Sequence, residues 1–239
     1  WLTAAGLHRA RRRRAHPRPP RERRARLGEL IQVDGSPHRW FEERGEACSL
    51  LLYIDDATSR ILGAHFAEHE TTDGYFELFE RAFTEHGLPG AIYSDKHGIF
   101  RINTSGAGTD EETHVQRALR ELGIELICAN TPQAKGRIER SNRTMQDRLV
   151  KELRLARIST IAEANRALPA LLAKHNERFA SAPRDPQDAH RPASSMPLGT
   201  ILTKRYERVL TKNFTFQITE HIYARDPPPG LCTRMRRGS

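Results

Sequence analysis

The sequence has few cysteines and no long apolar segment. Its three cysteines, Cys48, Cys128 and Cys232, lie far apart, and neither a CxxC pair nor an HExxH motif occurs. The sequence therefore gives no indication of a short-spaced zinc site or a disulfide framework, and we expect a reducing, cytoplasmic setting. No apolar run reaches the length of a membrane span, and the chain does not begin with an apolar signal segment. We expect no membrane partner.

Acidic residues are nearly absent from one segment, although they balance the basic residues elsewhere. The chain has a net charge of +9, and residues 1–26 hold ten arginines against one acid, Glu22. The segment includes four consecutive arginines, Arg11, Arg12, Arg13 and Arg14. Its many prolines and few apolar residues predict an extended or disordered arm. Guanidinium groups bind phosphates and release counterions, so we expect the arm to bind DNA without sequence preference. A merely solubilising linker is the alternative.

The length bounds the organisation of the chain. With 239 residues, it can form one core of ordinary size and a small appendage. We predict a basic arm at 1–26, a core at 27–180, a linker at 181–200, a small β module at 201–225 and a disordered tail at 226–239. The chain begins at Trp1 without a Met, and we expect a further N-terminal region to precede it.

Apolar patterns inside the core predict alternating strands and helices. The predicted strands are 29–35, 47–54, 60–67, 91–95 and 124–128, and the first three form an antiparallel meander. The predicted helices are 72–86, 112–122, a helix that contains Glu139, and 160–179. Short strands that alternate with amphipathic helices are typical of an α/β fold.

Three acidic residues lie at comparable places in these elements. Asp34 is near the end of the first strand, Asp95 ends the fourth, and Glu139 lies in a helix. On a helical period, basic and amide residues fall within about 60° of Glu139. They are Lys135, Asn142, Arg143 and Gln146. An acid among cations suggests a metal ligand in nucleic-acid chemistry, although a solvated helix face is the alternative.

The sequence around each acid resembles a known family. The segments 30–35 (LIQVDG), 93–100 (YSDKHGIF) and 132–140 (PQAKGRIER) are similar to the three motif blocks of DDE insertion-sequence transposases with a retroviral-integrase-like catalytic core. The segments 71–77 and 120–130 resemble the ISNCY-type group in particular. The resemblance covers residues 25–200.

The resemblance implies a ribonuclease-H-like core, a five-stranded mixed sheet flanked by helices. It also implies that Asp34, Asp95 and Glu139 are catalytic and bind two Mg²⁺ (or Mn²⁺) ions. Water would cut DNA at the element end, and the freed 3′-OH would attack target DNA. Lys135 and Arg143 would hold phosphates, and the active form would be a homo-oligomer.

Some features depart from the family's pattern. Forty-three residues separate Asp95 from Glu139, more than is common in retroviral integrases, and the excess lies in the loop 101–113. We expect this chain to lack the upstream helix-turn-helix of such transposases, and we expect the β module to be cut short or altered after Ala224. Two alternatives therefore stay open: a nuclease of the same fold without strand transfer, and an inactive remnant that only binds DNA.

Other polar residues near the predicted strand ends are rival candidates. Asp55 and Asp56 follow the second strand, where a hairpin turn explains them. His38 and Trp40 could line the site. His97 could contact DNA, and a structural hydrogen bond is the alternative.

Overall fold

The computed structural model describes residues 22–94, 98–100, 112–128, 136–206, 211, 215–218 and 221–224. The chain divides into two compact units, Trp1–Thr203 and Lys204–Ser239. Over these described ranges, we find no helix that is both long and apolar enough to cross a membrane.

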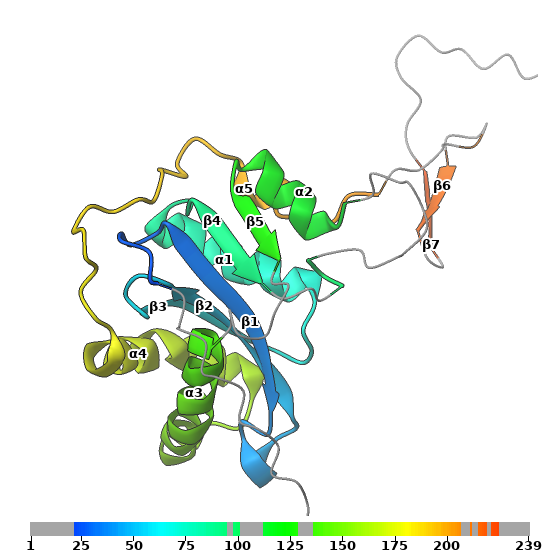
Figure 1. The fold of residues 1–239 in the computed structure, drawn as a ribbon. Helices are drawn as coiled ribbons and strands as arrows, with labels where there is room; N and C mark the ends of the chain where they lie inside the picture. Colours follow the sequence, from blue (N-terminus) through cyan, green and yellow to red (C-terminus); the bar gives the residue numbers. More distant parts are fainter. Residues whose placement is uncertain are drawn as a thin grey trace, which may run out of the picture. The chain divides into compact units, whose positions relative to one another are not determined.

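A five-stranded mixed sheet forms the centre of the first unit (Figure 1). Its strands are β1 (Leu30–His38), β2 (Cys48–Asp55), β3 (Ile61–Ala67), β4 (Ala91–Ser94) and β5 (Glu125–Cys128), in the spatial order β3-β2-β1-β4-β5. The first three pair antiparallel, which confirms the predicted meander, while β4 is parallel to β1 and β5 is parallel to β4. The central strand is therefore β1, which carries Asp34.

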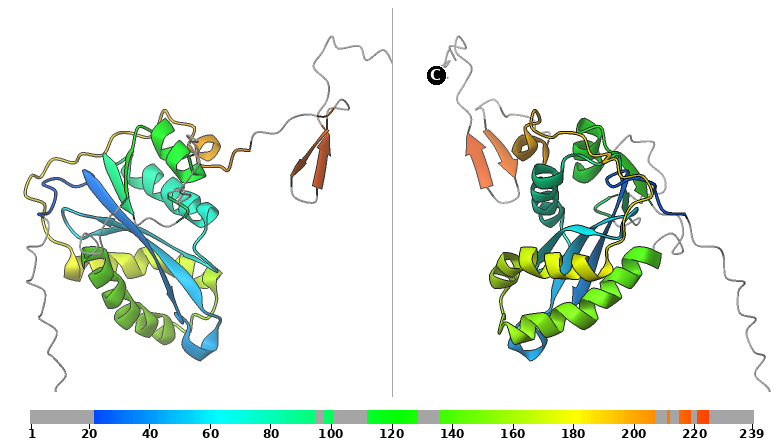
Figure 2. Two further views of the ribbon diagram at one scale, coloured as in Figure 1. Left: turned by 45° about the vertical axis from the view of Figure 1, so that its right-hand side comes forward. Right: turned by 90° about the vertical axis from the view of Figure 1, so that its left-hand side faces the viewer.

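Helices cover both faces of the sheet (Figure 2). The helices are α1 (Thr72–His86), α2 (His114–Glu121), α3 (Gly136–Leu155), α4 (Ile161–Phe179) and the short α5 (Leu198–Ile201), with a 3-10 turn at Glu42–Arg44. One core cluster joins α1 and α2 to the sheet, and a second joins α3 and α4 to its other face. Every residue of β2 is buried, because its side chains alternate between these two cores. Phe76, Phe79 and Phe83 of α1 lie in the first core.

The segment predicted as a linker, 181–200, belongs to the first compact unit. Its backbone N–H groups at Ser181 and Ala189 donate to the carbonyls of Thr58 and Leu27, and the backbones of Arg191 and Leu88 hydrogen-bond to each other. The Pro-rich composition predicted irregular backbone correctly. It could not show that the backbone N–H groups of Ser181, Ala189 and Arg191 find acceptors on the core.

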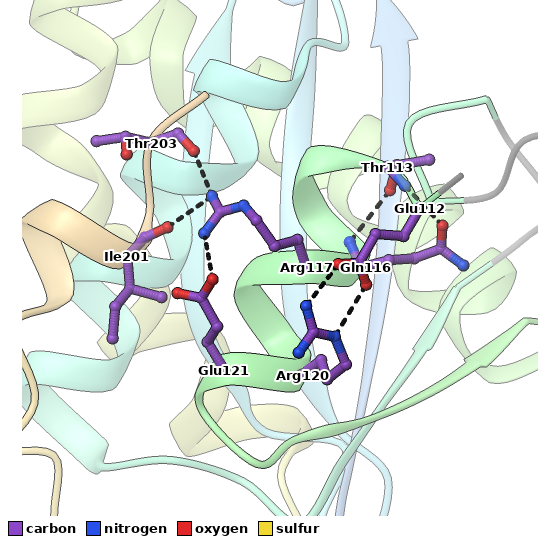
Figure 3. A network of polar contacts seen from close by, with 8 residues as sticks. All are labelled: Glu112, Thr113, Gln116, Arg117, Arg120, Glu121, Ile201 and Thr203. Carbon is purple, nitrogen blue, oxygen red and sulfur yellow. Dashed lines mark hydrogen bonds and ion pairs between the residues drawn. The ribbon is translucent and has the colours of Figure 1, made fainter. Parts of the chain in front are cut away.

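Arg117 of α2 forms hydrogen bonds with the residues that follow this segment (Figure 3). Its guanidinium donates to the carbonyls of Ile201 and Thr203 and forms an ion pair with Glu121 at 3.1 Å. At the N-terminus of α2, Thr113 and Gln116 form a reciprocal capping box. The last residues of the first unit, up to Thr203, are thus held to α2 by hydrogen bonds.

The last residues of the predicted arm also contact the core. Arg23 donates to the carbonyl of Ala57, and the backbone N–H of Arg24 donates to the Asp56 carboxylate. The arginines of the four-residue run, Arg11, Arg12, Arg13 and Arg14, lie outside the described residues.

The second unit contains an antiparallel pair of strands, β6 (Thr215–Ile218) and β7 (His221–Ala224). These strands lie within the segment 201–225, for which a small β module was predicted. Arg205 and Tyr206 are not in a strand, and residues 207–210 and the predicted tail lie outside the described part.

Candidate active site

Asp34 lies in the middle of β1 and is partly buried. Its neighbour Val33 points into the core under α1 and α2. Since side chains alternate along a strand, Asp34 and Ser36 point to the opposite face, which α3 covers. Asp34 pairs with Leu52 of β2, a residue of the second core. The Asp34 carboxylate therefore lies beside apolar residues of the second core.

The helix α3 is fixed over β1 by an apolar stripe and two side-chain hydrogen bonds. The stripe consists of Ile138, Met145, Leu149 and Leu153, all buried. The Asn142 amide Nδ2 donates to Asp34 Oδ2 at 2.8 Å, and Gln146 Nε2 donates to Ser36 Oγ at 2.9 Å. Four helical residues rise about 6 Å and two strand residues about 7 Å, so the two contacts match in spacing. These two contacts therefore fix how α3 lies over β1.

Glu139 is exposed on α3, as is Arg143. Residues three and four apart on a helix are neighbours, so Glu139 lies beside both Asn142 and Arg143. The contact between Asn142 and Asp34 brings this part of α3 to the Asp34 carboxylate. Two of the three predicted catalytic acids, with one predicted phosphate-binding arginine, thus come from elements that touch at this point.

The third acid, Asp95, lies outside the described residues, as do His97 and Lys135. The strand β4 ends at Ser94, and its Tyr93 pairs with Gln32, two residues before Asp34. Among the residues that are described, no group of three or more His, Cys, Asp or Glu side chains could hold a metal ion. The roles of Asp95 and Lys135 stay predictions.

Asp55 and Asp56 are structural, in agreement with the predicted turn. Asp55 accepts hydrogen bonds from the N–H groups of Gly28 and Thr58, and Asp56 accepts from the Gln32 amide. Burial raises the pKa of the Asp55 carboxyl, and the hydrogen bonds from Thr58 and Gly28 partly offset this rise. Both carboxylates hold the turn to the start of β1.

His38 and Trp40 take different places after Asp34. His38 is exposed at the end of β1. Trp40 is fully buried, packs edge-on against Phe66, and donates from its indole N–H to the carbonyl of Ser36. The hypothesis that Trp40 lines the site is therefore wrong. An aromatic ring of this size contributes more as core than at a solvated edge.

Sequence reasoning missed Asn142 as a partner of Asp34. It is 9% exposed, and its Oδ1 is a buried acceptor with no hydrogen-bond partner among the described residues. The available signal was a carboxamide one turn after Glu139 on the same face. The pattern could not show which strand residue that amide reaches.

A solved structure shares this architecture. A chain of the simian T-cell lymphotropic virus intasome, solved in complex with the PP2A regulatory subunit B56 gamma, superposes with a TM-score of 0.54 at 18% identity. The match covers 72% of this chain and 57% of that chain. The fold is the ribonuclease-H-like fold of retroviral integrase cores, which confirms the predicted fold class.

Two proteins are similar in sequence. The protein y4bF of Sinorhizobium fredii (strain NBRC 101917 / NGR234), assigned as a transposase, is 46% identical over 219 residues, which are 90% of this chain and 48% of that protein. The transposase for insertion sequence IS1202 of Streptococcus pneumoniae is 41% identical over 170 residues, which are 70% of this chain and 36% of that protein. The predicted resemblance to insertion-sequence transposases is confirmed. The chain spans less than half the length of each of these relatives, and no protein-family model matches it.

Proposed function

We propose that this chain contains the catalytic core of a DDE transposase, a polynucleotidyl transferase that cleaves DNA and joins the freed end to target DNA. The similarity to two transposases and the ribonuclease-H-like fold support this class of activity. The observation that carries the proposal is the hydrogen bond from Asn142 to Asp34. It joins the helix of Glu139 to the strand of Asp34.

The side chains present fit a divalent cation. Asp34 and Glu139 offer carboxylate oxygens, the ligands that Mg²⁺ prefers. Asn142 holds Asp34 with its Nδ2, and its buried Oδ1, which lacks a partner among the described residues, can accept a hydrogen bond from a bound group. When bound, two Mg²⁺ or Mn²⁺ ions would activate the attacking oxygen and stabilise the leaving oxygen of a displacement at phosphorus.

Each residue has a role in this proposal. Asp34, Asp95 and Glu139 would hold the two ions through their carboxylate oxygens. Lys135 and Arg143 would hold DNA phosphates beside the ions, and the run Arg11, Arg12, Arg13 and Arg14 would add a contact without sequence preference.

The proposal extends to partners and setting. The DNA partners would be transposon ends and target, and an active assembly that handles two ends would contain more than one copy of the chain. The setting would be the cytoplasm.

The test is substitution of each acid. Asp34→Asn, Asp95→Asn and Glu139→Gln should each reduce Mg²⁺-dependent nicking of plasmid DNA to background and weaken Mn²⁺ binding measured by calorimetry. Thermal unfolding should show that each variant is folded. Glu125→Gln is a matched control, because Glu125 is an exposed acid at the start of β5. Retention of both nicking and Mn²⁺ binding by Asp34→Asn would refute the proposed site.

The second half of the activity needs its own assay. A labelled duplex that ends in a 3′-OH is incubated with plasmid, and covalent joining is measured on a denaturing gel. Joined product is expected. Nicking without any joined product would favour the nuclease alternative over a transposase.

A further inference from the structure

A groove lies between α3 and α4, which cover the same face of the sheet (Figures 1 and 2). It encloses about 250 Å³. The α3 wall is formed by residues between Met145 and Glu152, and the α4 wall by residues between Leu171 and Phe179. The floor is apolar, and the rim is mostly basic.

Acidic residues do not balance the basic ones around this groove. Its rim holds four basic residues, Arg148, Lys151, Lys174 and Arg178, against two acids, Asp147 and Glu152. Both acids are already paired: Asp147 with Lys151 at 2.6 Å, and Glu152 with Lys174 at 3.0 Å. Arg148 and Arg178 have no carboxylate partner among the described residues. Two positive charges thus face the groove without a counter-charge from the described protein.

An aromatic ring orients one of these arginines. The Arg148 guanidinium lies 5.0 Å from the ring centroid of Phe179, which is 40% exposed. The His175 ring lies 4.7 Å from the same ring. Burial and the neighbouring Arg148 lower the pKa of His175, so its imidazole is neutral at pH 7. The stack presents a guanidinium in a defined orientation without a second fixed charge beside it.

We propose that this groove binds the phosphate backbone of DNA through Arg148 and Arg178. Guanidinium groups without a protein counter-ion are the side chains best suited to bind phosphate. The groove is separate from the candidate active site. Arg148 follows Glu139 by nine residues, which places it about half a turn around α3 and about 14 Å along it. The DNA segment bound here therefore differs from the phosphates that Arg143 would hold, and the proposal does not depend on catalysis at Asp34 and Glu139.

The first test maps the contact directly. The full chain is treated with phenylglyoxal, which modifies exposed arginines, with and without duplex DNA, and modified peptides are quantified by mass spectrometry. DNA should protect Arg148 and Arg178 several-fold. Arg166, an exposed arginine of the same α4 that does not line the groove, should stay reactive and serves as the control. Equal reactivity of Arg148 and Arg178 with and without DNA would overturn the proposal. Equal protection by inorganic phosphate alone would also overturn it, since it would indicate a small-anion site.

The second test measures how the DNA affinity depends on salt concentration. Each lost phosphate contact lowers the slope of log affinity against log salt by about one. The double variant Arg148→Ala/Arg178→Ala should lower the slope by about two relative to the parent, measured by fluorescence anisotropy with duplex DNA. Arg166→Ala should leave the slope unchanged, and Arg148→Lys/Arg178→Lys should retain most of it. Thermal unfolding checks that each variant is folded. An unchanged slope in the folded double alanine variant contradicts the proposal, as does a variant whose only defect is loss of self-association in sedimentation.

Discussion

The turn after β2 and the crossing of β1 with α3 both hold carboxylates, but they use them differently. At the turn, Asp55 is 0% exposed, and its oxygens accept from Gly28 N at 3.0 Å, Thr58 N at 2.7 Å and Thr58 Oγ1 at 2.6 Å. At the crossing, Asp34 is partly buried and Glu139 is exposed. A carboxylate enclosed by donors of its own turn fixes backbone. One that keeps exposed surface next to a second acid can receive a ligand.

The asparagines of α3 and α4 differ in the same way. Asn165 and Asn176 of α4 each bond both the N–H and the C=O of one β3 residue, Phe66 and Ile61 respectively. Asn142 of α3 uses its Nδ2 on Asp34, and its buried Oδ1 has no described partner. Asn165 and Asn176 use both amide atoms on backbone groups, so their role is structural. The crossing of β1 and α3 keeps hydrogen-bonding capacity for something outside the protein.

The largest expected effect tests the carboxylates. Asp55→Ala should lower the free energy of unfolding by about 3–5 kcal/mol, because buried N–H and O–H donors lose a charged acceptor. Asp34→Asn should change it by less than about 1 kcal/mol, since its carboxylate is partly exposed and its shape is preserved. Urea unfolding of both variants measures the difference. Equal losses would break the distinction between a structural and a ligand-binding acid.

Much of the fold could be predicted because local patterns agree with tertiary contacts. The apolar run of β2 and the helical spacing of Phe76, Phe79 and Phe83 determine these elements directly. Predictions failed where the length of an element depends on its pairing with another strand. The first strand was expected to end at Gly35, yet β1 continues to His38, because Ser36, Pro37 and His38 pair with β2. Composition carries no information on that pairing.

The candidate site could be predicted only in part. The order of acids along the chain predicted Asp34 and Glu139 as site residues, and the elements that carry them meet. The role of Asn142 could not be predicted, since the contact with Asp34 depends on the register of a helix over a strand 108 residues away. Sequence periodicity gives the face of a helix and not the residue beneath it.

A smaller effect is expected from the carboxamide at the crossing. Asn142→Ala should lower the nicking rate and the Mn²⁺ affinity by about 10–100-fold, as is typical for loss of a group that orients a metal ligand. Gln146→Ala is the matched control, because it removes a similar contact to Ser36 instead of Asp34. Mn²⁺ titration by calorimetry separates orientation of Asp34 from general loosening of α3. Equal losses of Mn²⁺ affinity in both variants would show that the seating of the helix, and not the Asp34 contact, matters.

The smallest effects are expected at the edge strand β3, where α4 takes the place of a further strand. Asn165 and Asn176 lie eleven residues apart, about 16 Å along α4, and their partners Phe66 and Ile61 lie five residues apart, about 17 Å along β3. The two spacings agree, so one straight helix can cap both positions. Asn165→Ala and Asn176→Ala should each lower the free energy of unfolding by about 1–2 kcal/mol through two lost hydrogen bonds.

These two losses should add in the double variant to within about 0.5 kcal/mol, because the sites are far apart and share no partner. Nicking should be unchanged, since neither residue contacts the crossing of β1 and α3. Urea unfolding and the plasmid assay measure both quantities, and light scattering would detect association through the uncovered edge. A strong coupling between the two substitutions would mean that α4 detaches as a unit. A loss of nicking in the folded variants would mean that the closed edge and the candidate site are not independent regions.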